Sequence, residues 1–361
     1  MLSPHATVRG PLPKHTPVLV EALRDAGCHV QSEPWGRHSD DESLMGRIWS
    51  RARDIRHIRV LVRNSDLDVM VVKTSHDWVS LLRDLPLLLV TRRSAPHIVF
   101  QFHGGRSDML VAPKAWLFKA ASWVLFKLAD GVLVLSAEEA RYAAEFHPSG
   151  KFYTVVNPLV SPSMTLPERP GAESSSQVPT ILFASRLIEE KGVCDLLEAF
   201  ARVRAQRTCR LVVAGTGPAE ERLSCRAKEL RLSADVSFLG HVPADELLVV
   251  YRDADVFVLP TYWPEGFPTA ITEAMAAGLP VVTTRLRGMA DHLVERENAL
   301  FVAPKAPYEL ANAIQRLLDD DTLRARMSTA NRARVNDFAP PAAATRYLDA
   351  LRKITGTSHE A

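Results

Sequence analysis

Two glutamates that lie eight positions apart, Glu265 and Glu273, are the residues of this chain most suited to binding chemistry. Glu265 stands in a loop rich in glycine and proline, and Glu273 falls in the opening turns of the predicted helix that follows. The loop comes after an apolar strand at residues 255–259, so its N–H groups and the helix dipole favour an anionic ligand. The two carboxylates can accept hydrogen bonds from hydroxyl groups. The pattern predicts a phosphate flanked by polyhydroxylated groups, as in a nucleotide sugar.

A second predicted strand, residues 180–184, ends in a loop with two cations five positions apart, Arg186 and Lys191. A guanidinium can bind a diphosphate through two parallel hydrogen bonds, and an ammonium adds a point charge. The carboxyl ends of parallel strands are also where such sheets bind ligands. We therefore expect this pair to hold a diphosphate, with solvated loop charges as the alternative.

Gly215 and Gly217 follow the predicted strand at residues 210–214, where glycine allows close approach of the backbone to a ligand. A dinucleotide-binding fingerprint needs a third glycine three residues after Gly217, but Glu220 stands there. No acid closes the following strand in the expected place either. The pattern argues against a dehydrogenase.

The segment from Pro260 to Pro280 resembles the Glu-x7-Glu signature of family 4 glycosyltransferases, retaining enzymes of the GT-B fold that use nucleotide-activated sugars. The match includes the spacing, the Glu-Gly-Phe-Pro tetrapeptide and the trailing Glu-Ala-Met-Ala-x-Gly-x-Pro-Val. The loop at Arg186 is similar to the family pattern Gly-Arg-Leu-x-x-x-Lys-Gly, with Ser185 in the place of the usual glycine. The resemblance implies a metal-independent hexosyltransferase acting from a UDP-, GDP- or ADP-sugar, with no cofactor. The implied acceptor is a glycan or a lipid-linked molecule in surface polysaccharide or glycoconjugate synthesis.

The resemblance also assigns roles on the donor side. Arg186 and Lys191 hold the diphosphate and stabilise it as it leaves, and Glu273 binds the ribose hydroxyls. Glu265 lies near the hydroxyls of the transferred sugar. The loop at His241 and Val242 reads the edge of the nucleobase, although a partly exposed loop histidine is an equal alternative for His241. The backbone amides of the same loop surround the sugar and the phosphate: Gly266, Phe267 and Thr269. Pro268 can only shape the loop, because it lacks an N–H.

The front half contributes two further candidates through the resemblance. His103 follows the predicted strand at residues 98–102, where the family often has a His-Gly pair that faces the sugar. An ordinary loop histidine is the alternative. Gly10 lies in a segment similar to the loop after the first strand of the family. The glycine pair usual in that loop is replaced by Lys14-His15-Thr16, so either the loop is remodelled, with Lys14 as a substitute donor, or the start of the sequence is misassigned.

No arrangement of side chains indicates a metal or a covalent nucleophile. The Asp-x-Asp pairs at residues 66–68 and 253–255 open predicted strands, and no Ser-His-Asp or Cys-His set can be assembled. We expect cations and backbone dipoles to provide the electrostatic stabilisation that Mg²⁺ provides elsewhere. The predicted catalytic residues are His103, Glu265, Arg186 and Lys191. The retained anomeric configuration, which the resemblance implies, would result from front-face displacement assisted by the leaving diphosphate.

Apolar strands alternate with amphipathic helices along the chain, which predicts α/β domains with parallel sheets. The predicted strands are residues 67–72, 98–102, 131–135, 180–184, 210–214, 255–259 and 279–283, and the helices include 17–26, 193–205, 220–230 and 308–318. A segment rich in Pro, Ser and Glu divides the chain. The expected organisation is an acceptor-side Rossmann-like domain at 1–160, a linker at 161–179, a nucleotide-sugar domain at 180–336 and a tail helix at 337–361. The resemblance places the two domains across a cleft, with the tail crossing back to the first.

Composition limits the function classes. The chain has 361 residues and a net charge of +2, which does not indicate a nucleic-acid partner, and 47% of its residues are hydrophobic. The four cysteines lack metal-binding spacing, which is typical of a reducing compartment. There is no signal-peptide pattern and no apolar run of the ~18–20 residues that cross a bilayer, so we expect a cytoplasmic protein.

Residues 114–127 are amphipathic with aromatics and lysines, and five arginines lie on a neighbouring predicted helix between residues 51 and 63. Basic amphipathic helices can lie on anionic bilayers, so peripheral association with the inner face of the cell membrane is one expectation. A core-facing aromatic stripe with a solvated arginine face is the other.

Two other function classes stay open. A GT-B sugar-nucleotide epimerase is disfavoured by the paired Arg186/Lys191 and Glu265/Glu273 patterns. A non-catalytic partner subunit is conceivable because of the irregular Gly10 loop.

Overall fold

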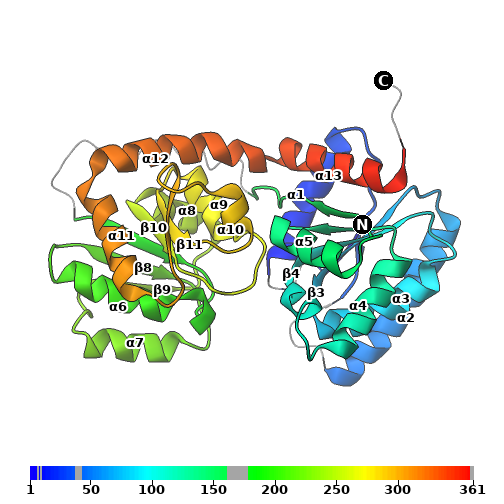
Figure 1. The fold of residues 1–361 in the computed structure, drawn as a ribbon, viewed down its shortest axis with the longest axis horizontal. Coiled ribbons are helices and arrows are strands. Elements are labelled where there is room, and N and C mark those ends of the chain that lie inside the picture. Colours follow the sequence, from blue (N-terminus) through cyan, green and yellow to red (C-terminus); the bar gives the residue numbers. More distant parts are fainter. Residues whose placement is uncertain (6–7, 9, 37–42, 161–177, 358–361) are drawn as a thin grey trace. The chain divides into compact units, whose positions relative to one another are not determined.

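The computed structural model describes residues 1–361 apart from 6–7, 9, 37–42, 161–177 and 358–361. It divides into two compact units (Figure 1). Unit 1 comprises Met1–Val160, Pro264–Phe267 and Phe338–Ala361, and unit 2 comprises Ser161–Trp263 and Pro268–Asp337. Most of the expected linker, residues 161–177, lies outside the described residues.

Unit 1 contains, among its described residues, a six-stranded parallel sheet in the order β2-β1-β3-β4-β5-β6. Its strands are β1 (Leu2–Ser3), β2 (Glu33–Pro34), β3 (Met70–His76), β4 (Ile98–Gly105), β5 (Gly131–Val134) and β6 (Phe152–Thr154). Its helices are α1 (Pro11–Asp25), α2 (Leu44–Asn64), α3 (Trp78–Thr91), α4 (Trp116–Leu128), α5 (Ala137–Phe146) and α13 (Pro340–Thr355).

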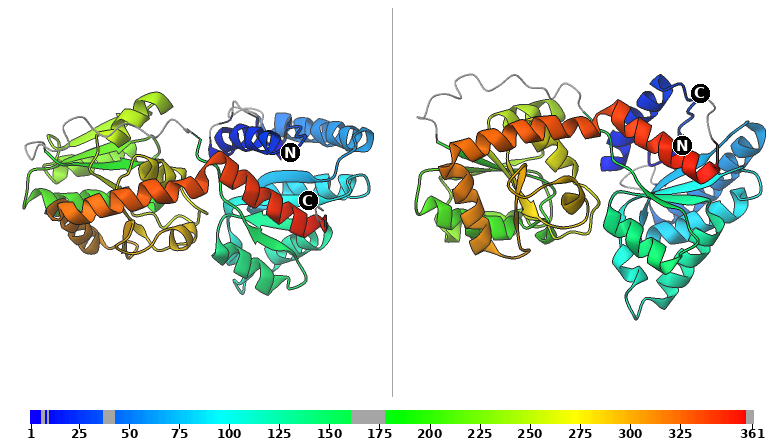
Figure 2. Two further views of the ribbon diagram at one scale, coloured as in Figure 1. Left: turned by 90° about the horizontal axis from the view of Figure 1, so that it is seen from above. Right: turned by 45° about the horizontal axis from the view of Figure 1, so that its top comes forward.

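Alternation along β3 and β4 separates the two faces of this sheet. Even-numbered residues such as Val72 and Phe100 pack in a core with side chains of α2, α3 and α4. Odd-numbered residues such as Val71 and Val99 pack in a second core with side chains of α1 and α13. Figure 2 shows α13 alongside α1. A helix at the end of the chain therefore completes the core of the unit that contains its beginning.

Unit 2 contains a second six-stranded parallel sheet of described residues, in the order β12-β11-β10-β7-β8-β9. Its strands are β7 (Thr180–Ala184), β8 (Arg210–Ala214), β9 (Val236–Gly240), β10 (Val256–Leu259), β11 (Val281–Thr284) and β12 (Ala299–Val302). Its helices are α6 (Val193–Arg204), α7 (Glu220–Glu229), α8 (Ala244–Arg252), α9 (Thr269–Ala276), α10 (Gly288–His292), α11 (Pro307–Asp319) and α12 (Asp321–Arg334). Helix α6 packs against α7 and α11, and α9 packs against α12.

The α/β class with two parallel sheets is as expected from the sequence, and β7 and β8 match the predicted strands residue for residue. The strands β1, β2, β6 and β12 were not predicted; the first three have only two or three residues, which carry little periodicity. Residues 236–240, for which no strand was predicted, form β9. This edge strand exposes alternate residues, so it lacks the continuous apolar run of the buried strands.

Candidate functional site

The strand order of unit 2 identifies where a ligand would bind. The first strand of the unit, β7, lies centrally, with β8 and β9 on one side and β10 to β12 on the other. The chain reverses its direction across the sheet between β7 and β10, and open parallel sheets bind ligands beyond the carboxyl ends of the strands at such a point. The loop after β7 carries Arg186 and Lys191, and the loop after β10 begins at Pro260. The predicted donor residues of these two loops therefore flank the reversal point.

Hydrogen bonds join these two loops directly. The carbonyl oxygen of Glu190 accepts from the backbone N–H of Tyr262 at 2.8 Å and of Trp263 at 3.1 Å. The Thr261 hydroxyl donates to the same oxygen at 3.2 Å. The Arg186 guanidinium is exposed and its central carbon lies 5.9 Å from the centre of the Trp263 ring. Lys191, in the short helical turn Glu189–Lys191, is only 4% exposed. The bonding of the loops holds the two cations next to the signature segment.

Glu273 is positioned by a buried tyrosine. It lies in the first two turns of α9, and its Oε2 accepts a hydrogen bond of 3.0 Å from the hydroxyl of Tyr251 in α8. The Tyr251 ring is fully buried and its centre lies 5.8 Å from that of Phe257 in β10. Burial, and then the Glu273 carboxylate, raise the pKa of Tyr251 well above its usual value. The hydroxyl therefore stays a donor, and Glu273 receives an orienting partner that the sequence did not indicate.

Gly215 and Gly217 have a packing role. A side chain on Gly215 would come within 1.9 Å of the Ser185 carbonyl oxygen, and one on Gly217 within 2.4 Å of that of Leu187. The Leu187 N–H donates to the Thr216 carbonyl at 3.0 Å, so the two loops run in contact. Glycine at these positions allows the loop of Arg186 to lie against the end of β8. His241 and Val242 directly follow β9, and His241 is exposed.

Residues 264–267 pack with unit 1 although they lie inside the unit 2 sequence. A Cβ atom on Gly104 would lie 3.3 Å from the Glu265 Cα, and one on Gly266 would lie 2.2 Å from the Leu135 Cβ. The Phe267 ring stacks on Phe338 with 5.1 Å between the ring centres. The structure thus brings Glu265 to the strand end that carries His103, while Pro268 caps α9 and Thr269 begins it in unit 2.

His103 lies within β4, which continues to Gly105, so it belongs to the strand and not to a following loop. Both of its ring nitrogens are enclosed and have no hydrogen-bond partner among the described residues. Burial, and then the charge of Lys73, hold the pKa of His103 well below its usual value. A neutral imidazole can donate one hydrogen bond and accept another, which suits contact with a hydroxyl group.

Gly10 is the residue before α1, with φ 147° and ψ 176°. The expectation that Lys14, His15 and Thr16 form a remodelled loop was wrong, because α1 begins at Pro11 and contains all three. Proline at the first helical position needs no N–H there, which explains the early start of the helix. Lys14 is exposed on α1, whereas His15 is buried and its Nδ1 bonds the Pro158 carbonyl oxygen at 2.8 Å.

The turn after β11 contains a buried arginine with a strained backbone. Arg287 has φ 43° and ψ −126° and is 5% exposed. A positive φ with that ψ is costly for a residue with a side chain, and strain of this kind persists where the surroundings enforce it.

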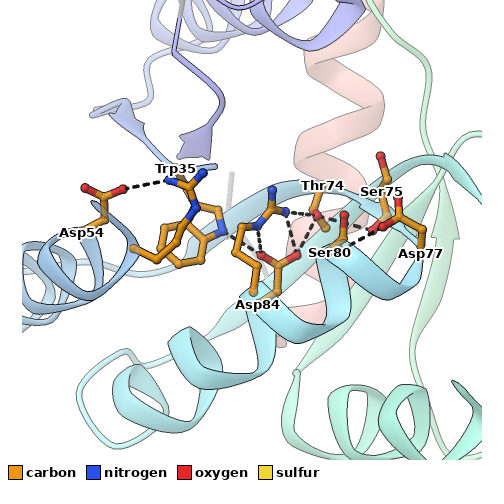
Figure 3. Close-up of polar contacts among 9 residues, drawn as sticks. Trp35, Asp54, Thr74, Ser75, Asp77, Ser80 and Asp84 are labelled. Carbon is orange, nitrogen blue, oxygen red and sulfur yellow. Dashed lines mark hydrogen bonds and ion pairs between the residues drawn. The ribbon is translucent and has the colours of Figure 1, made fainter. Parts of the chain in front are cut away.

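A polar network at the end of β3 was not predicted (Figure 3). The Asp84 carboxylate in α3 accepts from Trp35 Nε1 at 2.8 Å, Thr74 Oγ1 at 2.6 Å and Arg83 Nε at 2.7 Å. Asp77 caps the same helix by accepting from the Ser80 N–H at 2.9 Å. Asp84 is 1% exposed and its oxygens are satisfied. The network joins β3, α3 and residue 35, which is a structural role.

The described residues contain neither a cluster of metal-ligating side chains nor a membrane-spanning helix. In the described part of the chain, no three His, Cys, Asp or Glu side chains group closely enough to hold a metal ion. Asp255 instead accepts from the Thr180 N–H at 2.7 Å, and Asp253 pairs with Arg252 at 2.9 Å. Among the same described residues, every helix is too short or too polar to span a bilayer.

A protein-family model matches most of the second unit. Residues 167–334 match the family model described as glycosyl transferases group 1. The matched residues coincide with most of unit 2.

Curated relatives match this chain over different lengths. An uncharacterized glycosyltransferase of Methanocaldococcus jannaschii is 36% identical over 140 residues, which are 39% of this chain and 36% of that protein. A D-inositol 3-phosphate glycosyltransferase of Corynebacterium glutamicum is 29% identical over 315 residues, covering 79% of this chain and 74% of that protein. The matched part of the chain thus spans little more than a third of the length of the first relative.

Solved structures match nearly the whole chain. Sucrose-phosphate synthase from Thermosynechococcus elongatus has a TM-score of 0.77 at 22% identity, covering 99% of this chain and 98% of that one. HepE from Anabaena, in complex with UDP-glucose, has a TM-score of 0.73 at 17% identity, covering 98% of both chains. These likenesses show the fold: two Rossmann-like units of the GT-B type, as the sequence predicted.

Proposed function

We propose that this GT-B chain is a retaining family 4 glycosyltransferase, which moves a hexosyl group from a UDP-, GDP- or ADP-sugar to a glycan or lipid-linked acceptor. The observation that carries the proposal is the bonding of the Arg186/Lys191 loop to the signature loop at the reversal point of the unit 2 sheet. The group 1 domain match over residues 167–334 supports it, as does a structural neighbour that binds UDP-glucose. The implied role is in surface polysaccharide or glycoconjugate synthesis.

In the proposed reaction, the bond between the anomeric carbon and the diphosphate oxygen breaks. The acceptor hydroxyl oxygen bonds to the same face of that carbon, and its proton passes to the leaving diphosphate. Arg186 and Lys191 offset the negative charge that develops on the diphosphate, where preorganised cations act most strongly. Because two cations and loop amides serve this purpose, the proposed reaction needs neither a metal nor a cofactor.

The remaining side chains take binding roles in this proposal. Glu273, oriented by Tyr251, accepts from the ribose hydroxyls, and Glu265 with the amides of Gly266, Phe267 and Thr269 surrounds the sugar. His103 is neutral and contacts a sugar hydroxyl. His241 and Val242 lie beside the nucleobase, with Gly215 and Gly217 shaping the loops. Gly10 adds a backbone contact from unit 1.

A binding assay with matched variants tests the donor site. The chain is titrated with UDP, GDP and ADP by calorimetry, and donor hydrolysis is followed with a panel of sugar nucleotides. Removing one charge-assisted hydrogen bond in Glu273→Ala, Arg186→Ala or Lys191→Ala should weaken nucleotide binding about 10- to 100-fold. Lys228→Ala, an exposed cation on α7, serves as the control and should bind normally.

The same assay separates the other classes. Slow hydrolysis of one sugar nucleotide supports the transferase. Interconversion of the sugar with the nucleotide still attached would assign an epimerase. Indifference to every nucleotide would assign a non-catalytic partner subunit, and normal binding in all three variants would refute the donor site itself.

We also propose peripheral binding to the inner face of an anionic membrane through unit 1. Helix α4 buries Phe118, Leu125 and Phe126. Part of its aromatic stripe therefore faces the core, as the alternative interpretation of this segment predicted. Trp116 and Leu117 of the same helix are 69% and 52% exposed, and Lys114 and Lys119 flank them. Sedimentation with anionic vesicles at physiological salt tests this proposal, which fails if the protein stays in the supernatant.

A further inference from the structure

A lysine with no partner lies inside unit 1. Lys73 stands in the middle of β3, is 1% exposed, and its Nζ makes no hydrogen bond within the described residues. Its odd number places it on the sheet face covered by α1 and α13, next to Val71 of that core. Burying an ammonium group without a counter-charge is costly, so the position requires an explanation.

Other unpartnered donors lie beside Lys73. Gln101 of β4 is its direct neighbour across the strand pair. The Tyr347 hydroxyl of α13 donates to Gln101 Oε1, which leaves Nε2 as a buried donor without a partner among the described residues. His103 follows two residues later on the same face of β4, and both of its ring nitrogens are likewise enclosed and unpartnered. Three neighbouring side chains thus each carry a buried donor that has no partner among the described residues.

The electrostatic surroundings of this group are positive. Burial lowers the pKa of Lys73 to about 7, and no carboxylate of the described residues acts on it. Burial and the charges of Lys73 and His15 lower the pKa of His103. Burial also lowers the pKa of His15 to about 4, with Lys73 and Lys14 adding to the effect. A negative charge in the cluster would stabilise the charged form of each of these groups.

We propose that Lys73, Gln101 and His103 form a buried binding site for a small anion, either chloride or an anionic oxygen of a phosphate or carboxylate. His103 lies near the carboxyl end of β4 and is half-buried as a residue, although its ring nitrogens are enclosed. That end of a strand is where ligands approach a parallel sheet. The anion comes either free from solution or as the charged end of a substrate. The inference concerns unit 1 alone and stands whether or not the chain transfers sugar.

Thermal unfolding of the full chain tests this site. Sodium chloride or sodium phosphate replaces sodium gluconate, a bulky anion, at constant ionic strength. A ligand that binds only the folded state raises Tm with its concentration. The wild-type Tm should rise in chloride or phosphate by several degrees. Lys73→Met, which keeps the length of the side chain and removes its charge, should unfold in gluconate at or above the wild-type Tm and show no response to the anion.

Two further variants keep the test decisive. Gln101→Glu places a carboxylate where the anion would be, so it should fold stably and also lose the response. Lys228→Met removes an exposed cation and should respond like the wild type. Stabilisation by chloride or phosphate identifies a free anion, and stabilisation only by glucose 1-phosphate that is lost in Lys73→Met and Gln101→Glu identifies a substrate-borne one. Equal responses in wild type, Lys73→Met and Gln101→Glu, or no response in the wild type to any anion, would overturn the proposal.

Discussion

At the scale of single residues, the candidate site combines side chains that the sequence indicated with partners that it concealed. Glu273 follows from the signature spacing, but Tyr251, which donates to it at 3.0 Å, lies twenty-two positions earlier in another helix. No local pattern marks a tyrosine as the partner of a particular carboxylate. The same holds for Lys73, since an isolated lysine in an apolar strand indicates neither its burial nor its neighbours.

The hydroxyl of Tyr251 is predicted to support nucleotide binding. Tyr251→Phe keeps the ring against Phe257 and removes the hydroxyl, which donates to Glu273 and also lies 3.3 Å from the Ala270 carbonyl oxygen. A hydrogen bond to a charged group contributes about 1.5–3 kcal/mol, and part of that free energy acts on binding, so the dissociation constant for the bound nucleotide should rise by up to about 10-fold. Calorimetric titration measures it, and Tyr308→Phe, at a position 64% exposed, is the control. Equal affinity in Tyr251→Phe and the wild type would show that the hydrogen bond has no such role.

At the scale of elements, loops that are distant in sequence are fixed to one another by backbone bonds. The loop after β7 and the loop after β10 meet because β7 and β10 are neighbours in the sheet, and the Glu190 carbonyl joins them. In unit 1, the end of β3 is fixed to α3 through the Asp84 carboxylate (Figure 3). Polar side chains hold these elements together where the sheet and its helices end.

Removal of the Asp84 carboxylate is predicted to destabilise unit 1. Asp84→Ala leaves the buried Trp35 Nε1 without its acceptor and removes the buried carboxylate that pairs with the Arg83 guanidinium. Breaking a buried pair on one side costs about 3–5 kcal/mol of the free energy of unfolding. Urea denaturation followed by tryptophan fluorescence measures the loss. Asp253→Ala, which removes an exposed partner of Arg252, should change little, and similar midpoints for the two variants would contradict the prediction.

At the scale of the whole molecule, neither unit is one continuous stretch of sequence. Unit 1 takes its first 160 residues, the four residues 264–267 and the C-terminal segment with α13. Ala344, Tyr347 and Ile354 of α13 are buried in the same core as Val71 and Val99. The C-terminal helix is therefore part of the folding unit of the N-terminal sheet.

Truncation after Asp337 is predicted to loosen unit 1 and leave unit 2 folded. It exposes the core face of α1 and removes the buried side chains of α13, each worth about 1.5–3 kcal/mol of burial. Hydrogen–deuterium exchange should speed up in α1, β3 and β4 and stay slow in β7 to β11. Truncation after Thr357, which retains α13, is the control. Unchanged exchange in α1 after removal of α13 would contradict this account.

The sequence alone determined the α/β class and the long buried strands and indicated candidate donor residues at strand ends, because periodicity and loop composition act locally. The spacing of Arg186, Lys191, Glu265 and Glu273 is likewise a local feature, so these residues could be predicted as candidates. Only the tertiary structure decided that Glu265 packs beside Gly104, that α13 closes the first core and that Lys73 meets Gln101 and His103. Those pairings depend on strand order and helix packing between distant residues, up to the 335 positions from Leu19 to Ile354 in one core, and contacts at such separation leave no local trace in the chain.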